Sequence, residues 1–188
     1  DRVEWVDHGT DPTAMIAALE SEEVDCNHQT LADTVEQLDA VGIPKSEVTT
    51  GSTIVARTNV NNPPYDDVRV RRALQFAVDN NIVLQLGYNG LGSQAHNYHV
   101  GDMHVEHYPL PPHERDVEQA KALLEEAGQM DYEHELISID DDWRRNTTDA
   151  IAAMLRDAGI KVKRTIIPGA TFWNDWTKYP YSTTNWNA

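Results

Sequence analysis

Histidines crowd one stretch of the sequence in a pattern that could bind a metal ion. His96, His99, His104 and His107 fall within twelve residues. Neutral imidazoles are ligands for zinc, nickel and copper, and a bound zinc ion can activate water for hydrolysis. However, His104-Val-Glu-His107 is not the His-Glu-x-x-His motif of metallohydrolases, and the stretch has no helical period. Residues 96–113 therefore indicate either a metal-dependent hydrolase or metal-binding domain, or an exposed polar loop without a metal.

Two other motifs look like ligand-binding loops but lack the residues that such loops require. The acidic run 140–142 is followed by Arg145 and Ile151 where a calcium loop needs Gly and Glu. The glycines of residues 87–92 do not follow the order Gly-x-Gly-x-x-Gly, and they follow a predicted helix rather than a strand. We expect the acidic run to be a helix N-terminus, whose dipole favours negative charge. The spacing assembles no catalytic pattern, so we expect neither enzymatic activity nor a cofactor.

The tryptophans near the end of the sequence suggest two different roles. Trp173 and Trp176 fall on one face of a short predicted helix, and packing in the core is the expected role of that face. Trp186 lies instead in a stretch rich in Thr and Asn. We expect Trp186 either to dock onto a partner or to belong to a structure that continues past residue 188.

Charge and composition exclude several classes of partner. The 188 residues carry a formal net charge of −16, which opposes binding to nucleic acid and to anionic membranes. Apolar runs do not exceed six residues, such as 14–19, whereas a membrane span needs about 20. Cys26 is the single cysteine, so an internal disulfide is impossible, and low cysteine content fits the cytosol and the bacterial periplasm alike. The sequence opens without an initiator Met or a signal peptide, as expected for a mature product or an excised fragment.

Hydrophobic periodicity predicts strands that alternate with helices. This order indicates an α/β fold with a mixed, partly parallel sheet flanked by helices. A long irregular stretch, 87–112, interrupts the pattern, and loops of that length are usually functional or wrap another surface. The predicted strands are 3–6, 24–26, one bent or two short strands in 46–60, 136–139, 160–166 and 183–186. One predicted helix begins at Asp11-Pro12-Thr13, and another is capped by Asp66 or Asp67. The other predicted helices cover 31–38, 82–86, 117–127, the segment containing 151–155, and 171–177.

Several blocks of the sequence resemble the family 5 extracytoplasmic solute-binding proteins, the dipeptide-, oligopeptide- and nickel-binding components of bacterial ABC importers. Residues 63–74 read PPYDDVRVRRAL and are followed by Ala77-Val78-Asp79, close to the family signature Pro-Phe-x-Asp-x-Arg-Val-Arg-x-Ala-Leu and then Ala-Ile-Asp. Residues 120–128, AKALLEEAG, resemble a helix of the family. Residues 18–25 and 155–162 match further blocks, so that the resemblance covers nearly the whole sequence.

This resemblance implies a fold and a function. It implies one lobe of a type II periplasmic-binding-protein-like clamshell, with residues 1–188 forming a single α/β lobe, the second, and with the first lobe missing. It implies a periplasmic receptor that closes its lobes around a peptide or peptide-like solute and delivers it to ABC permease subunits. Arg57, Asn59 and Trp186 are the residues that the resemblance places near the solute, although structural pairing is the alternative role for them.

Overall fold

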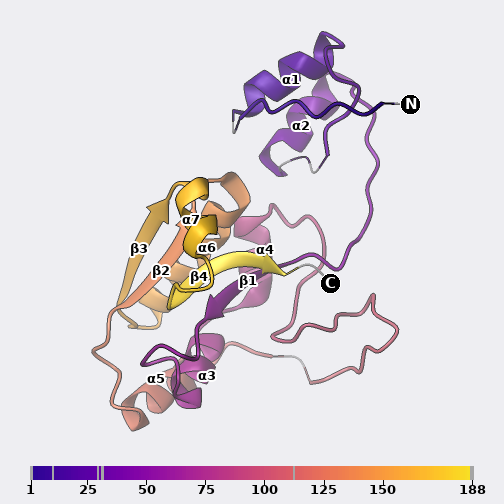
Figure 1. The fold of residues 1–188 in the computed structure, drawn as a ribbon. Coiled ribbons are helices and arrows are strands. Elements are labelled where there is room, and N and C mark those ends of the chain that lie inside the picture. Colours follow the sequence, from indigo (N-terminus) through magenta and orange to yellow (C-terminus); the bar gives the residue numbers. More distant parts are fainter. Residues whose placement is uncertain (1, 10, 29, 31, 112, 187–188) are drawn as a thin grey trace. The chain divides into compact units, whose positions relative to one another are not determined.

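The computed structural model describes residues 2–9, 11–28, 30, 32–111 and 113–186 (Figure 1). Contacts within the chain group into two compact units, Asp1–Val48 and Thr49–Ala188. The assignment of residues 1–188 to one lobe stays a prediction. None of the helices formed by the described residues has the length and apolar character needed to cross a bilayer.

The described residues of the first unit form two helices and irregular backbone. Helix α1 spans Pro12–Glu20 and α2 spans Ala32–Ala40, close to the predictions, with Leu31 outside the described residues. The strands predicted at 3–6 and 24–26 are wrong, because both segments lie in irregular backbone. A strand needs a neighbour to satisfy its amides and an apolar face to bury. The side chains of the first segment are largely exposed instead; Val3 and Trp5 are each 79% exposed.

The second unit is built on a mixed four-stranded sheet with the strand order β1-β4-β2-β3. Strand β2 pairs in parallel with β3 and β4, whereas β1 runs antiparallel to β4. This arrangement confirms the predicted partly parallel α/β class. Within the region 46–60, the described strand is β1 alone, shorter than predicted. The strands are β1 Thr53–Thr58, β2 His134–Ile139, β3 Val162–Ile167 and β4 Tyr181–Trp186.

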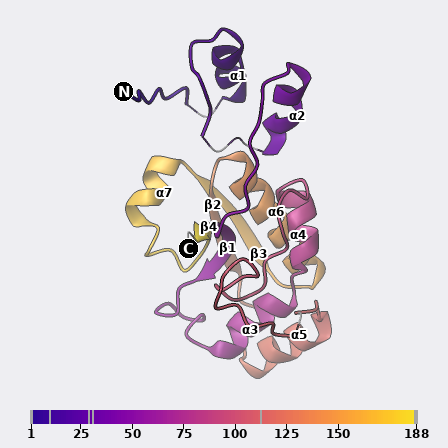
Figure 2. The ribbon, with the colours of Figure 1, turned by 90° about the vertical axis from the view of Figure 1, so that its right-hand side faces the viewer.

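Helices pack on both faces of this sheet (Figures 1 and 2). Side chains alternate between the faces along β2. Leu136 joins the main core with Leu155 of α6 and residues of α3 and α5, whereas Ile137 and Ile139 face Phe172 of α7. The helices are α3 Val68–Phe76, α4 Asn80–Gly87, α5 Val117–Glu126, α6 Asp142–Asp157 and α7 Gly169–Asp175.

Local sequence signals explain where these helices begin and end. The Asp141 carboxylate accepts a hydrogen bond from the Arg144 amide at 3.1 Å and caps α6, which confirms the prediction for the acidic run. Asp67, Asp79 and Asp116 cap α3, α4 and α5 in the same way. Helix α6 is followed by Gly159 with φ +78°, the left-handed conformation that glycine adopts at least cost.

The short helix α7 corrects the prediction for the two tryptophans. Phe172 is the fully buried side chain of this helix, whereas Trp173 is 45% exposed and Trp176, at its C-terminal end, is 38% exposed. A single helix of seven residues turns only a narrow face toward the sheet, and Phe172 fills it. The predicted core packing of Trp173 and Trp176 is therefore wrong.

Candidate functional site

The two ends of the sheet differ chemically and are named here by their residues. The carboxyl edge comprises residues 139–144, 167–169 and 185–186, where the three parallel strands end. The amino edge comprises residues 57–59, 134 and 176–181, where β1 ends and the parallel strands β2 and β4 begin. In open α/β sheets, ligands bind outside the carboxyl ends of the strands, so the carboxyl edge is the candidate site.

Trp186 is the largest half-exposed side chain at the carboxyl edge. It ends β4 opposite Thr53, and 46% of its surface is exposed. The imidazole of His99 stacks on it, with the ring centroids 4.4 Å apart and the planes 24° from parallel. His99 belongs to the long loop 88–111, which the sequence predicted as the irregular stretch. The indole therefore offers a flat surface that already accepts a planar group.

Arg144 ties three elements together at the same edge. Its guanidinium pairs with Asp141 in the cap of α6 and donates a hydrogen bond to Oδ1 of Asn185 at 2.9 Å. It also lies over the rings of Trp143, at 3.7 Å, and of Trp173, at 5.4 Å. Only 14% of the Arg144 side chain is exposed, so the group is held firmly. A cation, an amide and two aromatic rings thus lie together at the edge where β4 ends with Trp186.

Arg57 and Asn59 lie at the amino edge instead. Nη2 of Arg57 donates to the carbonyl oxygen of Trp176 at 2.6 Å, and the guanidinium lies 4.8 Å from the Trp176 ring centroid. Burial lowers the pKa of Arg57. Nδ2 of Asn59 donates to the carbonyl oxygen of Thr177 at 3.1 Å. These contacts fasten β1 to the segment between α7 and β4, and Arg57 pairs with Ser182, four positions before Trp186.

The structure therefore separates the three residues that the resemblance grouped. Trp186 lies at the carboxyl edge, and Arg57 and Asn59 are engaged in structural pairing at the other edge. A solute contact by Arg57 or Asn59 stays a prediction, and the geometry gives it no support. Arg144 and Asn185 were missed by the sequence reasoning. The available signal was the cap itself, because Asp141 predicts a helix start and places Arg144 in its first turn.

The histidine-rich loop is organised by stacking rather than by convergence on an ion. The Tyr98 ring stacks with the rings of His96 and His107, at centroid distances of 5.4 and 6.3 Å. Nδ1 of His104 lies 3.0 Å from the Gly101 amide nitrogen. Within the described part of the chain, no three His, Cys, Asp or Glu side chains gather in a way that could hold a metal. The metal set His96, His99, His104 and His107 thus finds no support in the geometry.

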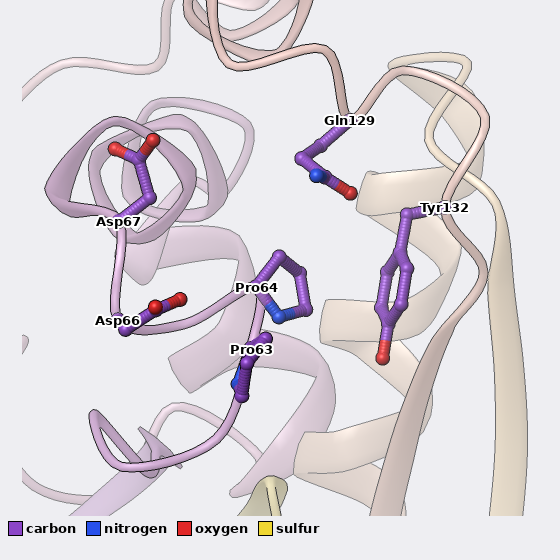
Figure 3. A pocket seen from close by; sticks show the side chains of 6 residues that line it. All are labelled: Pro63, Pro64, Asp66, Asp67, Gln129 and Tyr132. Atoms are coloured by element: carbon purple, nitrogen blue, oxygen red, sulfur yellow. The ribbon is translucent and has the colours of Figure 1, made fainter.

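A separate depression of about 370 Å³ lies beside the turn before α3 (Figure 3). Its acidic group Asp67 already caps α3 and pairs with Arg69 at 2.5 Å, an arrangement that lowers the pKa of the carboxyl group. None of the carboxyl-edge residues lines it. Asp66 adds a second carboxylate, so this depression is acidic, and it lies apart from the carboxyl edge. The lining residues are Pro63, Pro64, Asp66, Asp67, Gln129 and Tyr132.

Known proteins share both sequence and fold with this chain. A probable peptide ABC transporter periplasmic-binding protein of Sinorhizobium fredii is 30% identical over 179 residues, 87% of this chain and 32% of that protein. The dipeptide-binding protein of Escherichia coli is 40% identical over 70 residues, 37% of this chain and 13% of that protein. The structure of AgaA from Agrobacterium tumefaciens R10 in complex with agropinic acid has a TM-score of 0.82 at 25% identity, over 95% of this chain and 38% of AgaA. The chain thus spans less than two fifths of the length of each of these proteins.

A family profile extends over the entire sequence. The profile of the middle region of the bacterial extracellular solute-binding proteins, family 5, matches residues 1–188. These are non-catalytic, periplasmic solute-binding proteins of ABC transporters. The hydrolase interpretation of residues 96–113 is therefore wrong, whereas the predicted absence of enzymatic activity is confirmed. The chain belongs to the bacterial extracellular solute-binding proteins of family 5.

Proposed function

We propose that this chain supplies the second lobe of a receptor that binds a peptide or peptide-like solute and delivers it to ABC permease subunits. One observation carries the proposal: at the carboxyl edge, Asn185 is hydrogen-bonded to Arg144 and is followed along β4 by the half-exposed ring of Trp186. That edge is where open α/β sheets bind ligands.

The chemistry of the carboxyl edge suits a peptide. A peptide presents flat amide groups, donors, acceptors and terminal charges. The Trp186 ring offers a planar apolar surface that is partly open, and such surfaces stack well on amide and aromatic groups. The guanidinium of Arg144 and the amide of Asn185 are already oriented by their mutual hydrogen bond, which reduces the entropy lost on binding a polar solute.

Two of the relatives support a peptide as the solute. The Sinorhizobium protein matches most of this chain and is named as a peptide transporter component. The dipeptide-binding protein matches a shorter segment at higher identity. Closure of two lobes around the solute is the expected motion, because the solute stabilises the closed state only if it contacts both lobes. The first lobe and the permease are thus the proposed partners of this chain.

Isothermal titration calorimetry tests the proposal. The complete polypeptide that contains these residues is titrated with tripeptides such as Ala-Ala-Ala and Ala-Phe-Ala. Binding at micromolar or tighter Kd, weakened at least tenfold by Arg144→Gln, is the expected result. Arg145→Gln is the matched control, because Arg145 is on the same helix but forms an exposed ion pair with Asp140. Absence of tripeptide binding, or equal losses in both variants, contradicts the proposal.

A second candidate solute is agropinic acid. The structure of AgaA with agropinic acid has a TM-score of 0.82 to this chain. Agropinic acid enters the same titration as a separate ligand. Tighter binding of agropinic acid than of every tripeptide assigns the receptor to that solute and overturns the peptide assignment, while leaving the carboxyl edge as the site.

A further inference from the structure

The Trp186 surface at the carboxyl edge is shared with another ring of the same chain. His99 stacks on Trp186 at 4.4 Å and 24°, a geometry typical of two flat π systems. His99 is itself exposed, and it reaches Trp186 from the loop 88–111. The imidazole thus lies where a planar group of a bound solute would stack.

The loop that carries His99 is fastened near both of its ends. Asn80 of α4 donates a hydrogen bond to the carbonyl oxygen of Ala95 at 2.8 Å. Past the other end, Nε2 of His113 lies 2.8 Å from the carbonyl oxygen of Gln75. Tyr98, adjacent to His99, stacks within the loop rather than on the sheet. Rotation of the His99 side chain away from Trp186 therefore leaves these anchoring contacts in place.

We propose that His99 occupies the place on Trp186 that a planar side chain of the solute takes when it binds. In this sense His99 is an internal stand-in for that side chain. This inference rests on the proposed function, and it narrows the solute class to peptides that carry an aromatic or imidazole ring. Such a ring replaces His99 on Trp186, whereas an aliphatic side chain cannot stack and leaves His99 in place. While His99 covers Trp186, a solute ring cannot stack there. The apparent association constant for a ring-bearing peptide is therefore reduced by the fraction of molecules in which His99 covers the indole.

Two substitutions with opposite effects follow from this competition. His99→Ala uncovers Trp186, so we expect Ala-Phe-Ala to bind about 2- to 10-fold more tightly. His99→Phe strengthens the internal stack, so Ala-Phe-Ala is expected to bind more weakly than to the unsubstituted protein. The affinity for Ala-Leu-Ala changes less than twofold in both variants, because that peptide does not compete through stacking.

The experiment is calorimetric titration of the complete polypeptide and its variants with Ala-Phe-Ala and Ala-Leu-Ala. Tyr108→Ala is the matched control: it removes an aromatic ring from the same loop, but Tyr108 is 75% exposed, so both affinities should stay unchanged. Trp186→Leu should abolish the preference for Ala-Phe-Ala, and circular dichroism verifies that the variant is folded.

The outcomes separate this inference from the function on which it rests. Equal affinities for both peptides, or a His99→Ala variant that shifts both affinities alike, overturn the stand-in role while the peptide receptor stands. Failure of every tripeptide to bind the unsubstituted protein overturns the proposed function itself. A preference for Ala-Phe-Ala that grows in His99→Ala and shrinks in His99→Phe supports the inference.

Discussion

The two edges of one sheet use similar residues for opposite purposes. At the amino edge, the guanidinium of Arg57 donates a hydrogen bond to the Trp176 carbonyl oxygen and lies over the Trp176 ring. At the carboxyl edge, Arg144 also lies over tryptophan rings, but its amide partner Asn185 stands next to a half-exposed Trp186. The difference lies in the hydrogen-bond acceptor, which is a backbone carbonyl at the amino edge and a side-chain amide at the carboxyl edge.

The comparison teaches that residue type alone does not identify a binding group. An Arg and an Asn near the end of a strand are equally suited to hold a loop or a solute. Their hydrogen-bond partners decide between the two roles: backbone carbonyls for Arg57 and Asn59, and side chains beside an open ring for Arg144. Substitutions at matched positions of the two edges should therefore divide into effects on stability and effects on affinity.

The largest expected effect is a pH dependence of stability at the amino edge. His134 begins β2, is fully buried, and its Nδ1 lies 3.0 Å from the Tyr65 hydroxyl. Burial lowers the pKa of His134 from 6.5 to about 4. The unfolded chain therefore takes up this proton more readily than the folded one. Stability is complete above pH 6.5 and declines as the pH falls toward 4, by about 3 kcal/mol.

Urea denaturation at pH 7.5, 6.0, 5.0 and 4.0 measures this loss. In His134→Gln, the free energy of unfolding should decline with falling pH by about 3 kcal/mol less than in the unsubstituted protein. His113→Gln is the control, because His113 is partly exposed at the end of the loop. Parallel pH profiles for the unsubstituted protein and His134→Gln would remove His134 as the cause.

Loss of the open ring at the carboxyl edge should have the next largest effect. Trp186→Ala is expected to weaken the binding of a tripeptide about 30-fold, the scale of an aromatic hot spot. Trp176→Ala at the amino edge removes a ring of similar exposure, 38% against 46%. That control should lower the unfolding temperature and change the Kd less than twofold. Calorimetric titration of both variants checks this, and equal losses of affinity would abolish the distinction between the edges.

Much of this fold was predictable because its signals are local. The acidic run predicted the start of α6 at Asp141, and Gly159 predicted its end. The prediction of a strand at 3–6 was wrong because strand formation does not depend on local signals alone. Residues 3–6 favour extended backbone, but a strand also needs a neighbour, and pairing depends on segments that are distant in the sequence. The prediction that Trp173 and Trp176 pack in the core was wrong because their spacing fixes a common helix face but not the side on which the sheet lies.

The site was predictable only at Trp186, which the resemblance indicated. Arg144 and Asn185 are 41 residues apart and meet because β4 pairs in parallel with β2, with Ile137 opposite Ser182. That register brings the ends of the two strands to one edge. No local pattern encodes it, so neither residue could be assigned to the site without the sheet. His99 entered the sequence analysis as a metal ligand or as part of an exposed polar loop, and spacing alone could not show that the rings of His96, His99 and His107 stack on aromatic neighbours.

Arg57→Ala tests whether the amino edge contributes to stability rather than to solute binding. It removes a short charge-assisted hydrogen bond to the Trp176 carbonyl and the cation–π contact with its ring. We expect the free energy of unfolding to fall by about 1.5 kcal/mol, with the tripeptide Kd unchanged within twofold. Arg145→Ala, which removes an exposed ion pair, should cost about 0.5 kcal/mol or less. A Kd that rises tenfold in Arg57→Ala would instead place solute contact at the amino edge.

The smallest expected effect comes from the same substitution at each edge. Asn59→Ala removes the hydrogen bond to the Thr177 carbonyl, and Asn185→Ala removes the acceptor for Arg144. Each should cost about 1 kcal/mol of folding free energy in urea denaturation, the typical net value of one hydrogen bond. They should differ in affinity: the tripeptide Kd rises about 3- to 5-fold in Asn185→Ala, because Arg144 loses its orientation beside Trp186, and stays unchanged in Asn59→Ala. If the two variants bind equally, the hydrogen-bond partners of a strand-end asparagine do not reveal its role, and the edges differ in stability alone.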